Sequence, residues 1–102
     1  MSKKLPAEDR KRQILSAAVR VAARPGGWAS MTRIAVANEA GLSEAMVSIH
    51  FGTMLNFRRS VMREAIRLSQ LSIVAQGLAS GDKCAQKADM ALKQKALASL
   101  AA

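Results

Sequence analysis

The chain has 102 residues and a formal charge of +9, from 16 lysines and arginines against 7 aspartates and glutamates. This length suits one small domain, and a composition of strong helix formers with only 3% aromatic residues predicts an all-α fold. The single cysteine excludes an internal disulfide, and no apolar run approaches the ~18 residues that a membrane span needs. The N-terminus has no apolar segment behind its charges, so we expect no signal peptide and a cytoplasmic protein. The charge favours a polyanion as partner.

The first predicted helix follows a short basic arm. Residues 1–5 contain Lys3 and Lys4, and Pro6 suits the first position of a helix because that position needs no amide hydrogen. Apolar residues then recur at helical spacing up to the glycine-proline break at residues 25–27. We expect the only tryptophan, Trp28, to be a core anchor because so small a core needs its large side chains inside.

Residues 32–51 contain two short helical patterns joined by a tight turn. Gly41 can take the left-handed conformation just past the first helix, and Leu42 can fold back as the hydrophobic contact of that cap. Ser43 suits the N-cap of a second helix that runs to about Phe51. This spacing predicts a helix-turn-helix.

Several residues of this stretch resemble the DNA-binding region of the TetR-type repressors. They are Thr32, Ile34, Val36, Ala37, residues 40–43, Val47 and residues 50–53, and residues 12–18 resemble the first helix of that family. The resemblance covers residues 10–66 and implies a three-helix DNA-binding domain followed by a long fourth helix. Ser48 stands where the family usually has a tyrosine, and Met54 where it usually has a phosphate-binding lysine.

The predicted DNA contacts divide into reading and anchoring residues. Four residues of the second helix are expected to face bases: Glu44 a cytosine, Ala45 and Met46 a thymine methyl, and Ser48 either base edge. The anchoring residues, expected at phosphates, are Lys3, Lys4, Thr32, Arg33, Ser43 and Thr53. His50 is either a phosphate or groove contact at the end of this helix or a capping or packing residue. Arg58 either belongs to a solvated face or replaces the lysine missing at Met54.

The second half of the chain predicts a dimerisation region. We therefore expect two regions: residues 1–53 bind DNA, and residues 54–102 form the dimer. Thr53 is a plausible N-cap for a long helix from Met54 to about Gln76, and after a break at residues 77–81 a short C-terminal helix runs from 82 to about 100. The apolar residues expected at the dimer interface are Leu68, Leu71, Val74, Leu78 and Leu92.

These features favour a sequence-specific, homodimeric repressor that binds a palindromic operator through the second helix of the motif. The alternative is a nonspecific or architectural DNA-binding protein, which predicts a steep salt dependence and little sequence preference. An enzyme is not expected, because His50 and Cys84 are the only histidine and cysteine and no acidic cluster has catalytic spacing. We expect no cofactor or metal. The residues beyond the fourth helix are too few to enclose a ligand cavity of ~300 Å³, so no small-molecule ligand is expected either.

Overall fold

The computed structural model describes residues 6–100, and within them every regular element is a helix. The elements are α1 Ala7–Ala22, α2 Gly27–Ser30, α3 Arg33–Ala40, α4 Glu44–Phe51, α5 Met54–Arg67, α6 Leu71–Ala79, α7 Lys83–Gln86 and α8 Met90–Leu100. The predicted all-α class is confirmed. Lys3 and Lys4 lie outside the described residues. Within residues 6–100, no helix is both long enough and apolar enough to cross a membrane.

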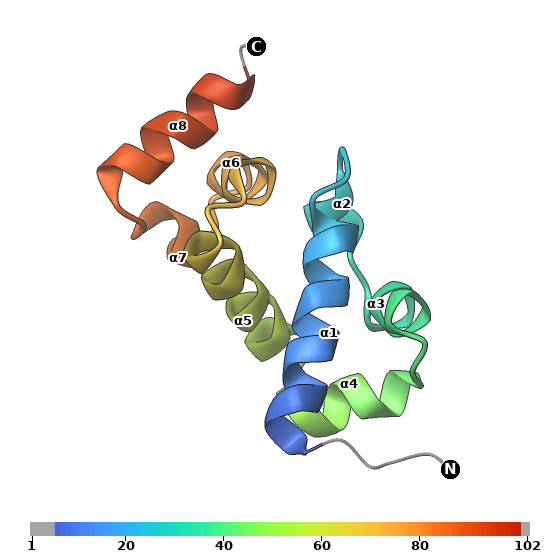
Figure 1. Ribbon diagram of the computed structural model, residues 1–102. Coiled ribbons are helices and arrows are strands. Elements are labelled where there is room, and N and C mark those ends of the chain that lie inside the picture. The colour runs from blue at the N-terminus through green and yellow to red at the C-terminus, as the bar shows by residue number, and fades with distance from the viewer. Residues whose placement is uncertain (1–5, 101–102) are drawn as a thin grey trace.

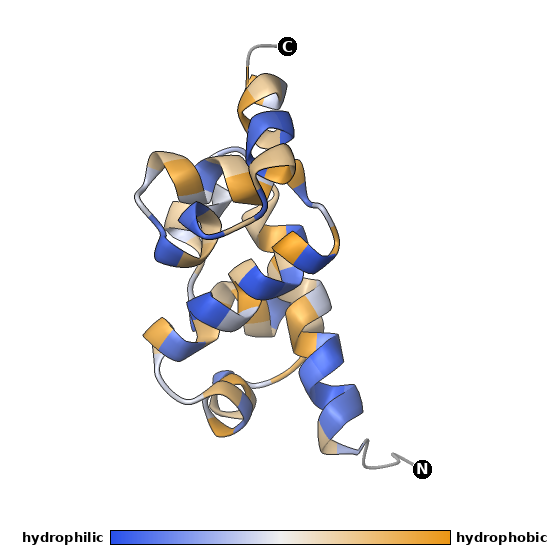
Figure 2. Cartoon of the chain, turned by 90° about the vertical axis from the view of Figure 1, so that its left-hand side faces the viewer, coloured by the Kyte–Doolittle hydropathy of each residue, from blue (hydrophilic) through white to orange (hydrophobic). Residues whose placement is uncertain are grey.

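Helix α1 lies at the centre of the first five helices, with α3 on one side, α5 on the other and α4 across its N-terminal end (Figure 1). Its apolar face is completely buried at Ile14, Ala17 and Ala18. The first turns of α1 are hydrophilic (Figure 2), which fits their exposure beyond the core. The helix ends at Ala22, ahead of the predicted break, and Trp28 is only 4% exposed, as expected for a core anchor.

The predicted corner between α3 and α4 is confirmed. Gly41 has a φ of 71°, in the left-handed region, and the Leu42 N–H donates back to the Ala37 carbonyl at 2.9 Å. This is the capping pattern that glycine permits because it has no Cβ to clash with the backbone. The Ser43 hydroxyl accepts from the Met46 N–H at 3.4 Å and so caps α4. Local sequence therefore fixes the geometry of this corner.

The predicted continuous helix from Met54 to about Gln76 is wrong, because α5 ends at Arg67 and α6 begins at Leu71. Ser69 has a φ of 54°, and the Gln70 N–H donates to the Ala65 carbonyl at 2.8 Å. This is again the pattern of a left-handed helix cap, here formed by a serine. A serine gives no stop signal in the sequence, which is why the break was missed.

The break allows α6 to fold back, so that neighbouring helices cover its apolar sides. Helix α6 packs against α5, α2, α7 and α8, and Ile73, Val74 and Ala75 are fully buried. A helix that is apolar on several sides needs several neighbours, and a straight extension of α5 would leave much of this surface in water. The assignment of Val74 to a dimer surface is therefore wrong: it belongs to the core of the chain. Leu71, Leu78 and Leu92 are partly buried against the same core.

Gln76 connects α6 to the end of α1 and the start of α2. Its side-chain amide donates to the Ala22 carbonyl at 2.7 Å, and its carbonyl oxygen accepts from the Trp28 N–H at 2.9 Å. One turn earlier, the Ser72 hydroxyl donates to the Ala23 carbonyl at 2.9 Å. The ends of two helices, which have unpaired backbone groups, are thus satisfied by side chains of α6.

We expect Gln76→Ala to lower the free energy of unfolding by about 2–3 kcal/mol, because part-buried backbone groups lose their partners. Urea denaturation followed by circular dichroism measures this. Gln94→Ala is the matched control, since Gln94 is exposed on α8, and it should change stability by less than about 0.5 kcal/mol. Equal effects of the two substitutions would contradict the connecting role of Gln76.

The predicted C-terminal helix is also divided, into α7 and α8. The Asp82 carboxylate caps α7 by accepting from the Ala85 N–H at 2.9 Å, and α8 packs against α6 through the fully buried Ala96. Gly77 was expected to break the chain, but it lies inside α6 and is buried. A Cβ there would collide with the end of Met62 and crowd Ala85, so glycine permits the close approach of α5, α6 and α7.

Candidate nucleic-acid interface

Helix α4 has one face in the core and the opposite face in solvent. Val47 is fully buried, and Phe51 packs against Phe57 with their ring centroids 5.1 Å apart. At 3.6 residues per turn, the opposite face is centred on Ala45 and Ile49. Ala45 is exposed and Ile49 is 74% exposed. The exposed face of α4 is therefore apolar at its centre.

The other residues predicted to read bases lie around this centre. Glu44 is exposed in the first turn of α4, and Met46 and Ser48 are partly exposed on either side of the face. The sequence prediction omitted Ile49. Its signal was present, because Ile49 lies four residues after Ala45 and two after the buried Val47, which places it on the outer face. Among the large apolar side chains described, Ile49 is the most exposed.

Three hydroxyl side chains begin the helices around α4. Thr32, Ser43 and Thr53 are the N-caps of α3, α4 and α5, and each hydroxyl oxygen accepts from a backbone N–H at 3.1, 3.4 and 3.2 Å respectively. All three residues are exposed. A hydroxyl that accepts one hydrogen bond still has its own proton to donate. Each cap can therefore also bind a phosphate oxygen beside the free amides of its helix.

Arg33 connects the start of α3 to the loop between α4 and α5. Its guanidinium donates to the Gly52 carbonyl at 3.3 Å, while its Nε is buried without a hydrogen-bond partner in the described part of the chain. The contact ties the loop that carries Thr53 to the helix that Thr32 caps. Two of the capping hydroxyls are thus held on one part of the surface.

Arg58 has a role inside the fold that the phosphate interpretation did not anticipate. Its guanidinium donates to the carbonyls of Trp28 at 2.8 Å, Met31 at 3.2 Å and Ala29 at 3.4 Å, and it lies over the Trp28 ring, 4.9 Å from the centroid. These contacts cap the C-terminal end of α2 and dock it on α5. With these donors engaged, Arg58 is not the free cation that a replacement for the lysine missing at Met54 requires.

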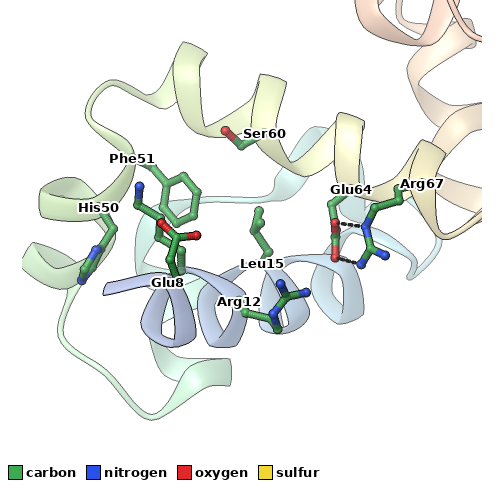
Figure 3. A pocket seen from close by; sticks show the side chains of 9 residues that line it. Glu8, Arg12, Leu15, His50, Phe51, Ser60, Glu64 and Arg67 are labelled. Carbon is green, nitrogen blue, oxygen red and sulfur yellow. Dashed lines mark hydrogen bonds and ion pairs between the residues drawn. The ribbon is translucent and has the colours of Figure 1, made fainter. Parts of the chain in front are cut away.

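His50 borders an open groove of about 390 Å³ between α1, α4 and α5 (Figure 3). Glu8, Lys11 and Arg12 of α1 also line the groove. At its other end Glu64 and Arg67 form a two-bond ion pair, with both distances 2.8 Å. His50 is partly exposed in the last turn of α4, so its position fits an edge contact better than core packing.

Several cations are neutralised by carboxylates away from α4. Glu39 accepts from Arg20 at 3.0 Å and from Arg24 at 2.8 Å, and these hydrogen bonds lower the pKa of its carboxyl group. The hydrogen bond from Arg67 likewise lowers the pKa of Glu64. Both carboxylates therefore stay charged at neutral pH. Arg59, Arg63 and Arg67 recur every four residues along α5 and differ in this respect. Arg67 is paired with Glu64, whereas Arg59 and Arg63 have no ion pair within the described residues.

Comparison of the chain with protein-family models, with curated proteins and with solved structures gave no match. A function for the chain therefore has to be inferred from its own residues and their arrangement. The features that lie together are the outer face of α4, three capping hydroxyls and the Arg33 contact that positions two of them.

Proposed function

We propose that this protein is a sequence-specific DNA-binding transcriptional regulator that inserts α4 into the major groove. The observation that carries the proposal is the outer face of α4, centred on Ala45 and Ile49 and held on a rigid corner by the caps at Gly41 and Ser43. A helix of this kind is what the major groove of B-DNA admits, and its N-terminal residues contact base edges in the helix-turn-helix.

Each exposed residue of α4 has a chemistry suited to a base edge. Ala45, Met46 and Ile49 can contact thymine methyl groups, Glu44 can accept from the amino group of cytosine, and Ser48 can pair with either edge. The hydroxyls of Thr32, Ser43 and Thr53 would bind phosphates and set the register of the helix. Lys3 and Lys4 would add affinity without sequence preference, and His50 would contact the backbone at the end of α4.

The composition of α4 favours a reading role over an architectural one. A protein that coats DNA without preference obtains nearly all its affinity from lysine and arginine contacts to phosphate. Helix α4 has neither lysine nor arginine, and it exposes the carboxylate of Glu44. A carboxylate at the groove is repelled by phosphates unless a base pairs with it, so its presence is better explained by selection of a base.

Binding-site selection on random duplexes tests this function, followed by affinity measurements on the selected site and all its single-base variants. Glu44→Ala should change which base pair is preferred at one position of each half-site. The free-energy difference between the base pairs at that position should change by about 1–3 kcal/mol. Lys4→Ala should instead weaken binding to all sequences alike. It should also reduce, by about 1, the slope of the logarithm of the binding constant against the logarithm of the salt concentration. If selection returns no common site, or if Glu44→Ala weakens all sequences equally, the reading role of α4 is wrong.

We also propose that the regulator is a homodimeric repressor on a palindromic operator, because one reading helix contacts too few base pairs for useful specificity. The dimer surface that the exposures support differs from the predicted one. Of the five predicted interface residues, Leu68 is exposed, at 43%. Met90 and Leu97 are 61% and 53% exposed at i and i+7 on the outer face of α8. This face of α8 is the better candidate for the second copy.

Met90→Glu combined with Leu97→Glu should therefore convert the dimer to a folded monomer of 10.9 kDa, because it places charges where apolar surface would be buried. Light scattering after gel filtration measures the mass, and circular dichroism measures the fold. The control is Ala79→Glu with Gln86→Glu, which adds the same charge at exposed positions on α6 and α7. A monomeric unsubstituted protein at micromolar concentration would contradict the homodimer.

A further inference from the structure

A cationic cleft of about 520 Å³ lies between α5 and α7. One wall is formed by Arg59 and Arg63, one turn apart on α5, and the other by Lys83 and Lys87 at the two ends of α7. Helix α5 lies between α7 and α1 and packs against both (Figure 1). The cleft is thus formed by two pairs of cations that the chain folds together.

Arg58 also lines the cleft, but its guanidinium donates to backbone carbonyls. The other four cations are not neutralised by the protein. Within residues 6–100, none of their side chains has an ion pair or a side-chain hydrogen bond, whereas Arg20, Arg24 and Arg67 all have carboxylate partners. The carboxylate among the lining residues is Asp82, whose Oδ1 accepts from the Ala85 N–H as the cap of α7. Like charges one turn apart destabilise a helix, so a bound anion would relieve this repulsion on both walls.

We propose that this cleft binds a small organic anion with two or more phosphoryl groups, of the kind found in nucleoside diphosphates and triphosphates. Arginine and lysine form strong charge-assisted hydrogen bonds with phosphate oxygens. Two cation pairs facing each other match an anion whose charge extends over neighbouring phosphoryl groups better than they match a single phosphate. The volume lies within the range of ~300–1,000 Å³ that is usual for small-ligand sites.

The shape of the site favours a small ligand over the backbone of a duplex. The cations line a hollow between two helices, whereas a duplex presents a broad convex surface. The sequence expectation of no small-molecule ligand was based on an enclosed cavity, and this site is an open charged groove. Residues 59–63 and 83–87 are far apart in sequence, so their pairing becomes visible only in the fold. The proposal does not depend on the DNA-binding role of α4.

Calorimetric titration of the full chain with sodium tripolyphosphate at physiological salt tests the site. The cleft variant Arg63→Gln/Lys87→Gln should lower affinity about tenfold or more. The control variant Arg12→Gln/Lys95→Gln removes the same charge at exposed positions on α1 and α8 and should change affinity by less than about twofold. Thermal melts establish that both variants are folded.

Cys84 gives a second, independent measurement. It is the only cysteine of the chain, it is partly exposed, and it lines the cleft. Tripolyphosphate should slow its alkylation by iodoacetamide in the unsubstituted protein and in the control variant, but not in the cleft variant.

Four results would overturn the proposal: no binding of tripolyphosphate, equal losses in the cleft and control variants, binding that leaves Cys84 unprotected, or a cleft variant that weakens only duplex binding. The last result would assign the cleft to the DNA backbone. Tripolyphosphate binding by a protein that selects no common DNA site would contradict only the proposed function.

Discussion

Ile49→Glu should weaken binding to the selected operator by about 100-fold or more, with no loss of stability. The side chain is 74% exposed at the centre of the outer face of α4, so its replacement removes no core contact. In the groove, however, a thymine-methyl contact is lost and a carboxylate is placed among phosphates. Losses of about 1–3 kcal/mol at each of two half-sites add in a dimer, to about 2–6 kcal/mol. Fluorescence anisotropy on the operator and on a scrambled duplex measures the effect.

Ala79→Glu is the control for charge alone. Ala79 is exposed in the last turn of α6, so this substitution adds the same carboxylate away from α4. It should weaken binding to the operator and to the scrambled duplex to the same small extent, because the added negative charge lowers the electrostatic attraction to any duplex. If the Ile49→Glu protein keeps its preference for the operator, α4 does not read the bases.

Arg58→Ala should lower the free energy of unfolding by about 2–4 kcal/mol. The substitution removes charge-assisted hydrogen bonds to the carbonyls of Trp28, Ala29 and Met31 and the contact of the guanidinium with the Trp28 ring. Hydrogen bonds to charged groups contribute about 1.5–3 kcal/mol, and a cation–π contact at a partly exposed site adds about 0.5–1 kcal/mol. Urea denaturation followed by tryptophan fluorescence reports directly on this contact, since Trp28 is the only tryptophan.

The neighbouring residue supplies the control. Arg59 is exposed and has no ion pair in the described chain, so Arg59→Ala should change stability by less than about 0.5 kcal/mol. The two substitutions remove the same side chain one position apart on α5. If Arg58→Ala leaves stability unchanged and instead weakens duplex binding, the arginine is a phosphate contact, which was one of the two sequence interpretations.

Much of the N-terminal half was predictable because its signals are local. A capping hydroxyl such as Ser43 acts on the amide three residues later, and a glycine such as Gly41 acts on the turn in which it lies. Helical periodicity also placed Val47 inside and Ala45 outside. The same periodicity also places Ile49 on the outer face. It was not predicted as a base contact because only the first two turns of the helix were expected to face bases.

The C-terminal half was less predictable because its breaks and contacts depend on distant residues. A serine can begin, continue or end a helix, and Ser69 ends α5 because folding α6 back buries Ile73, Val74 and Ala75. Gly77 suggested a break, yet it marks a close contact with residues of α5 and α7. Where burial decides the path of the chain, the local sequence leaves more than one path open.

The sequence by itself determined the all-α class, the corner between α3 and α4 and the face of α4 that is turned outward, since each depends on residues within a few positions of one another. Only the tertiary structure decided that Arg58 docks α2, that Gln76 joins α6 to α1, and that Arg59 and Arg63 line one cleft with Lys83 and Lys87. The physical reason is that arginine, lysine and glutamine have long, flexible and amphipathic side chains. Their partners are set by which helices pack together, and the burial of apolar surface across the whole chain decides that packing.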